Sequence, residues 1–164
     1  MIGAVLRLAL AVVSLTVALP AFAQVSLVGS WKLVSYARED PTTGNATAVW
    51  GEKPSGLLLF QPDGRMSAVI TGEGRKPAPP GEERIVEKQA KLFQTVTAYA
   101  GTYSVRGSTM TVHVEVASAP EFVGTDLVRE ILLQGEILNV RTQPMRSVSD
   151  GKTYVYVLAW KRLP

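Results

Sequence analysis

The sequence contains no cysteine among its 164 residues and only one histidine, His113. The absence of cysteine excludes disulfides, thiolate nucleophiles, thiolate metal ligands and a lipid anchor attached through cysteine. With a single histidine, a structural or catalytic zinc site is not expected either. The sequence also lacks a Gly-x-Ser-x-Gly element, and residues 72–77 do not have the spacing of a phosphate-binding loop. No metal and no cofactor is therefore predicted.

A strong excess of one charge is also missing. The chain has 17 Lys and Arg against 14 Asp and Glu, and the basic residues are scattered along it. Surfaces that bind nucleic acid concentrate basic residues in a patch or stripe, often with interleaved aromatic side chains. Nucleic acid is therefore not an expected partner.

Long hydrophobic runs are absent except near the start, at residues 8–19. Arg7 precedes this run, and Ala21-Phe22-Ala23 follows it as a small-x-small cleavage site, which is the layout of a signal peptide. A membrane-spanning helix needs about 20 apolar residues, so no stable membrane anchor is expected. We predict a signal peptide over residues 1–23, cleaved after Ala23, and one domain over residues 24–164. The lack of cysteine then favours a bacterial periplasmic or secreted protein.

Strand signals separated by turn residues dominate the rest of the chain. The clearest turn is Pro62-Asp63-Gly64, because Asp-Gly tolerates the positive φ that tight hairpins require. The pattern predicts an all-β fold, a single antiparallel up-and-down barrel of about eight strands, with one helix inserted between the third and fourth strands. The expected strands are residues 29–38, 56–61, 65–71, 101–106, 109–117, 126–133, 137–142 and 152–161.

The insertion begins with residues 71–81, which are rich in Gly and Pro and are predicted to form a loop. A helix is expected to follow from about Glu82. Apolar residues recur along it at helical spacing. We expect this helix to pack on the barrel or plug one end, where it would cover or gate the mouth. The residues of the apolar stripe are Ile85, Leu92, Val96 and Tyr99.

Gly29-Ser30-Trp31 opens the first predicted strand. In a closed barrel, a Gly in this place turns the chain inward and the Trp indole fills the barrel floor, so we assign Gly29 and Trp31 to that floor. This opening and later segments, in the same order, resemble bacterial lipocalin-like domains. The segments that carry the resemblance are residues 27–36, 51–58, 62–68, 99–103, 113–115, 124–129 and 158–162. The resemblance implies a lipocalin-type barrel but no particular activity, and carriage of a small apolar ligand follows only by analogy with classical lipocalins.

The candidate lumen residues are His113, Glu115, Arg129, Tyr103 and Tyr36. His113 and Glu115 share one face of a predicted strand, opposite a face that holds Met110, Val112, Val114 and Val116. The polar face points either to solvent or, in a cavity-bearing barrel, into the lumen. Arg129 lies on a mostly apolar face, where a buried guanidinium needs a partner, and Glu115 is the nearest candidate. The alternatives are a structural ion pair or surface exposure on one side and a ligand-binding or catalytic cluster on the other.

Three functions remain open at this stage. The first is an exported barrel that binds a small, largely apolar or amphipathic molecule. The second is a barrel enzyme for acid–base chemistry such as isomerisation, cyclisation or hydration. In that enzyme His113 would carry the proton, Glu115 would orient the His113 imidazole, and Arg129 would stabilise an oxyanion. The third is an envelope protein with a solid core. The sequence assigns neither a catalytic residue nor an oligomeric state.

Overall fold

The structure is a computed structural model, and it describes residues 26–81, 86–147 and 150–164. The predicted signal peptide, its cleavage site after Ala23 and the predicted helix start at Glu82 lie outside these residues. No helix within the described ranges is long and apolar enough to cross a bilayer.

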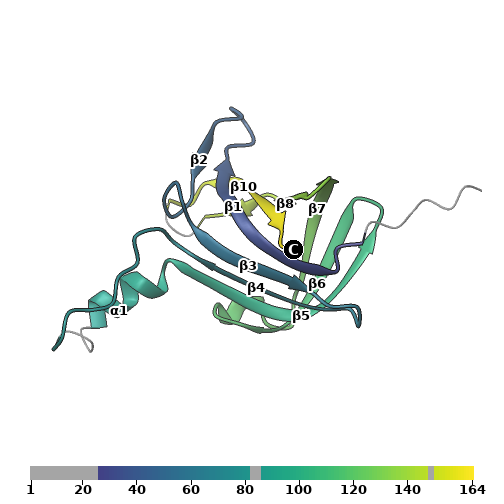
Figure 1. The fold of residues 1–164 in the computed structure, drawn as a ribbon. Helices are drawn as coiled ribbons and strands as arrows, with labels where there is room; N and C mark the ends of the chain where they lie inside the picture. The colour runs from purple at the N-terminus through teal and green to yellow at the C-terminus, as the bar shows by residue number, and fades with distance from the viewer. Residues whose placement is uncertain (1–25, 82–85, 148–149) are drawn as a thin grey trace, which may run out of the picture.

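The described residues form ten strands in one antiparallel sheet, which closes on itself where β1 pairs with β10 (Figure 1). The short strands β2 (Ala46–Ala48) and β9 (Met145–Arg146) extend the sheet beside β1 and β10, so the barrel wall consists of the other eight strands. The predicted eight-stranded up-and-down barrel is confirmed. The wall strands are β1 (Gly29–Glu39), β3 (Ser55–Phe60), β4 (Arg65–Thr71), β5 (Val96–Arg106), β6 (Thr109–Ala117), β7 (Asp126–Gln134), β8 (Ile137–Thr142) and β10 (Thr153–Arg162).

The hairpin between β3 and β4 shows how local sequence fixes the strand order. Gly64 has a φ of 84°, a conformation that side chains other than glycine rarely adopt. The Asp63 carboxylate accepts a hydrogen bond from the Arg65 backbone N–H at 3.0 Å. This turn brings β4 beside β3, with Phe60 opposite Met66.

The helix α1 (Val86–Phe93) lies between β4 and β5, which are the third and fourth strands of the wall, as predicted. Two details of the prediction are wrong. Val96 and Tyr99 belong to β5 and not to the helix, because their backbones pair with Thr71 and Ala68 of β4. The helix also neither packs on the barrel nor plugs it: none of its residues is buried, and it projects away from the strands (Figure 1).

The core lies inside the barrel and consists of apolar side chains that alternate with outward residues along the strands. Two β-bulges interrupt this alternation, at Val34 in β1 and at Glu115 in β6, and each leaves one residue without a partner in the neighbouring strand. A bulge changes which face the following residues occupy. Val116 is therefore exposed, although simple alternation places it with the buried Val112 and Val114.

The first strand enters the barrel at Gly29 and Trp31. Trp31 is fully buried, and its indole Nε1 donates a hydrogen bond to the Leu27 carbonyl at 2.9 Å. The guanidinium of Arg162 lies over the indole ring, 4.1 Å from its centroid. Gly29 has a φ of 133°, and a side chain there would approach Arg162 to 2.9 Å. Glycine is therefore required where the chain enters.

Candidate functional site

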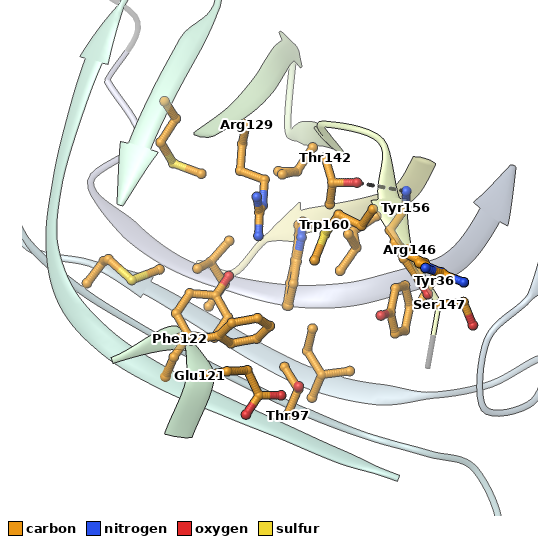
Figure 2. A pocket seen from close by; sticks show the side chains of 18 residues that line it. Tyr36, Thr97, Glu121, Phe122, Arg129, Thr142, Arg146, Ser147, Tyr156 and Trp160 are labelled. Atoms are coloured by element: carbon orange, nitrogen blue, oxygen red, sulfur yellow. Dashed lines mark hydrogen bonds between the residues drawn. The ribbon is translucent and has the colours of Figure 1, made fainter. Parts of the chain in front are cut away.

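The barrel encloses a cavity of about 350 Å³, at the small end of the roughly 300–1,000 Å³ typical of ligand pockets. Figure 2 shows the side chains that line it. Most of the wall is apolar. The apolar lining residues are Leu58, Met66, Ile70, Met110, Phe122, Met145, Val140, Leu158 and Trp160, and the others are Tyr36, Thr97, Tyr99, Glu121, Arg129, Thr142, Arg146, Ser147 and Tyr156.

The cavity is displaced from the Trp31 end of the barrel. Trp31 lies near the beginning of β1, whereas Tyr36 lies further along that strand, toward the end where Ile70 and Thr97 pair. Exposed Glu121 and Arg146 line the cavity. We call the end of the barrel that carries these residues the mouth. The described lumen is therefore packed around Trp31 and contains open space toward the mouth, so it is not solid throughout as the third function requires.

Tyr36 reaches the cavity because of the bulge at Val34. Leu33 and Trp31 are buried before the bulge, and Tyr36 takes the inward face after it. Its ring packs edge-on against Trp50 at 5.5 Å and tilts against Tyr156 at 5.9 Å between ring centroids. Burial raises the pKa of Tyr36 above its usual value, and the nearby Tyr156 and Tyr99 raise it further. The hydroxyl is therefore neutral at neutral pH and can donate a hydrogen bond.

Arg129 enters the cavity from β7, on the same face as the buried Leu127 and Ile131. Its guanidinium points into the cavity in Figure 2. Its Nη1 donates to the Val128 carbonyl at 3.0 Å, and none of the described carboxylates lies within 4 Å of it. Burial lowers the pKa of Arg129, while the neighbouring Tyr99 and Tyr36 raise it. A guanidinium nevertheless stays charged at neutral pH, so the cavity contains a fixed positive charge.

Two charged side chains, Glu121 and Arg146, lie at the mouth. Glu121 and Phe122 come from the 3-10 helix η1 (Pro120–Phe122), in the connection between β6 and β7. Arg146 donates to the Gly151 carbonyl at 3.1 Å. In Figure 2 Glu121 lies on the Thr97 side of the cavity, well apart from the Arg129 guanidinium.

His113 and Glu115 do not line the cavity. Both side chains point outward from β6, because the inward positions of this strand are taken by Met110, Val112 and Val114. The His113 side chain is 54% exposed, and its Nδ1 lies 2.8 Å from an Asp126 carboxylate oxygen. Glu115 pairs on the surface with Arg65 at 3.0 Å, not with Arg129. The structure therefore does not bring together the His113–Glu115–Arg129 cluster on which the enzyme hypothesis depends.

Tyr103 faces inward but lies away from the cavity. Its ring packs against Phe60 at 4.7 Å between centroids, and its hydroxyl donates to the Gln61 carbonyl at 3.3 Å. It lines a separate surface hollow with Leu27 and Val28 at the Trp31 end. Among the candidate lumen residues, Tyr36 and Arg129 are the two that the structure places at the cavity.

The family model described as lipocalin-like domain matches residues 28–163. The chain belongs to this family. A solved lipocalin-like protein from Bacteroides uniformis aligns with 84% of this chain and 98% of its own, at 16% identity and a TM-score of 0.42. No curated protein sequence matches the chain.

Several cavity residues of this lipocalin-like domain were not identified from the sequence. Tyr156, Leu158 and Trp160 alternate along β10, so their shared inward face was detectable from period-two spacing. The position of Tyr99 in the barrel wall was missed because the sequence pattern assigned this residue to the helix. No sequence signal identifies Glu121 and Phe122, since a short 3-10 turn in a connecting loop places them at the mouth.

Proposed function

We propose that this lipocalin-like domain is exported and binds a small, largely apolar molecule in the barrel cavity. The observation that carries the proposal is the cavity itself, about 350 Å³ inside a closed barrel, with a wall whose surface is mostly apolar. Ligand sites combine such walls with a few polar groups that fix orientation. Tyr36, Arg129 and Thr142 are groups of this kind here.

Binding can be tested by titration with N-phenyl-1-naphthylamine, a neutral apolar dye that becomes fluorescent in dry sites. Thr97 lines the cavity from β5, so Thr97→Phe should fill part of the lumen and weaken dye binding at least tenfold. The matched control is Val69→Phe on β4, because Val69 is 47% exposed and lies on the outer face beside Ala98. This control should bind the dye as the wild type does.

The outcome for these two variants decides the proposal. Loss of binding in Thr97→Phe alone, with both variants folded by circular dichroism, supports binding in the lumen. Absence of saturable binding to the wild type, or equal binding to both variants, would overturn it. Native mass spectrometry of protein purified from a bacterial host gives an independent check, since a retained ligand adds a defined mass.

Export rests on residues 1–23 and has its own test. The full-length chain, expressed in a bacterial host, should be recovered from the periplasmic fraction or the medium with Gln24 as its first residue. Recovery of chains that still begin at Met1 from the cytoplasm or the membrane would contradict export, without bearing on the cavity.

A further inference from the structure

We propose that the ligand carries an acidic head group that binds Arg129, while its apolar body occupies the rest of the cavity. This inference rests on the proposed function and specifies the chemical class of the ligand as an amphipathic organic anion. Its basis is a cation that lines the cavity and has none of the described carboxylates within 4 Å.

The position of Arg129 is unfavourable without such a partner. A guanidinium has five N–H donors, and the one hydrogen bond of this side chain in the described structure goes to the adjacent Val128 carbonyl. The nearest sequence candidate for a counterion, Glu115, is occupied outside the barrel by Arg65. Removing a cation from water without a counterion is costly, so a bound anion would recover much of that cost.

The groups around Arg129 fit an anion and not a second cation. Tyr99 and Tyr36 line the same cavity, and burial raises the pKa of both phenols, so they remain neutral hydroxyls at neutral pH. Neutral hydroxyls cannot balance the charge of Arg129, so the positive charge of the cavity stays uncompensated by these groups. A planar carboxylate in particular matches the two parallel N–H groups of a guanidinium.

The charge around the whole cavity points the same way. Two cations, Arg129 and Arg146, line it against one carboxylate, Glu121. Glu121 is exposed, and in Figure 2 it lies away from the Arg129 guanidinium. The apolar wall that includes Leu58, Leu158 and Trp160 excludes a small, fully hydrated ion as the preferred occupant. An acid with an apolar body matches both the positive charge and the apolar wall of the cavity.

A matched pair of dyes tests the inference. 1-Anilinonaphthalene-8-sulfonate has the aromatic body of N-phenyl-1-naphthylamine with an added sulfonate, so the two differ by one negative charge. The wild type should bind the anionic dye at least tenfold more tightly than the neutral one. Arg129→Met should weaken the anionic dye on the order of 30-fold, as expected for loss of a buried charge pair, and leave the neutral dye within about twofold. Arg129→Lys keeps the charge and should weaken binding of the anionic dye by less than Arg129→Met does.

Three controls keep the result interpretable. Arg146→Gln removes the other cation that lines the cavity and should reduce the preference for the anionic dye far less than Arg129→Met does. Arg65→Gln removes an exposed cation that does not line the cavity and should leave this preference unchanged. Displacement of the neutral dye from the wild type by decanoate and by 1-decanol needs no variant, and decanoate should be the stronger competitor at least tenfold. This last measurement applies even if the Arg129 variants do not fold.

Failure of the inference and failure of the proposed function give different results. Equal binding of the two dyes, equal competition by decanoate and 1-decanol, or loss of the preference in Arg146→Gln alone would overturn the role of Arg129 while leaving cavity binding intact. If neither dye binds the wild type, both proposals are overturned together.

Discussion

The Arg162 guanidinium stacks on the Trp31 indole, 4.1 Å from the ring centroid, and joins the last strand to the entry of the first. The same side chain donates to the carbonyls of Val28 at 2.6 Å and Ser26 at 3.1 Å. Because β1 also pairs with β10, these contacts hold the closure of the barrel at the end opposite the mouth.

Trp31→Ala should lower the free energy of unfolding by about 3–5 kcal/mol, since it removes a fully buried indole and its hydrogen bond to Leu27. Arg162→Ala should cost about 1–2 kcal/mol through the lost cation–π contact and hydrogen bonds. Urea unfolding followed by circular dichroism measures both. A Trp31→Ala protein as stable as the wild type would show that this end does not hold the barrel closed.

Gly101 of β5 should not accept even alanine. A Cβ at this position would lie 1.9 Å from the His113 carbonyl oxygen, because the bulge at Glu115 brings the β6 backbone close. Gly101→Ala must push the two strands apart and should cost about 3 kcal/mol. Thr102→Val, at the exposed neighbouring position, is the control and should stay within about 0.5 kcal/mol of the wild type. Equal stability of the two variants would contradict this packing.

His113→Ala should leave ligand binding unchanged, because the imidazole faces solvent on the outside of β6. Loss of the exposed pair with Asp126 should cost no more than about 1 kcal/mol of stability. Titration with N-phenyl-1-naphthylamine should give an affinity within twofold of the wild type. A large loss of affinity in a folded His113→Ala protein would return this residue to the functional site.

Tyr36 should make the protein less stable at alkaline pH. Burial raises the pKa of Tyr36 in the folded state, so above roughly pH 10 the unfolded chain releases this proton while the folded chain retains it. The contribution to stability is complete below pH 10 and is lost, by up to about 1.4 kcal/mol per pH unit, as the pH rises toward the folded-state value. Tyr36→Phe lacks this proton, and it is the matched control.

The measurement for Tyr36 is the difference in unfolding free energy between the wild type and Tyr36→Phe at pH 8.5 and at several values from 10 to 11.5. The wild type should lose stability relative to the variant only in the upper range. A difference that does not change with pH would mean that Tyr36 is solvated and not held in the cavity wall.

The fold was largely predictable from the sequence because the turns are strongly encoded. Pro62-Asp63-Gly64 fixes one hairpin, and regular alternation along β7 predicted that Arg129 shares a face with Leu127 and Ile131, as it does. Alternation along a strand does not predict where a β-bulge occurs, nor which residues it turns to the other face. The bulge at Val34 turns Tyr36 inward, and the bulge at Glu115 turns Val116 outward. Simple alternation detects neither bulge.

The partner of Arg129 was the least predictable feature. Adjacent strands suggested an ion pair with Glu115, but that carboxylate projects from the opposite side of the sheet and reaches Arg65. The side of the sheet that a polar face occupies depends on the closed barrel as a whole, which a single strand pattern does not contain. The prediction that Arg129 lies on an apolar face was correct. Its predicted partner was wrong, because neighbouring strands can direct their side chains to opposite sides of the sheet.

Methyl NMR with an added ligand tests the central claim, that the ligand binds inside the barrel, most directly. Leu58, Ile70 and Leu158 line the cavity, whereas Leu57, Val69 and Leu132 are exposed on the outer surface, so the two sets report on the two faces of the same wall. On titration with N-phenyl-1-naphthylamine, the inward methyl signals should shift and saturate together while the outward ones stay in place. Saturable shifts confined to the outward set would contradict the account and place binding on the outer surface of the barrel.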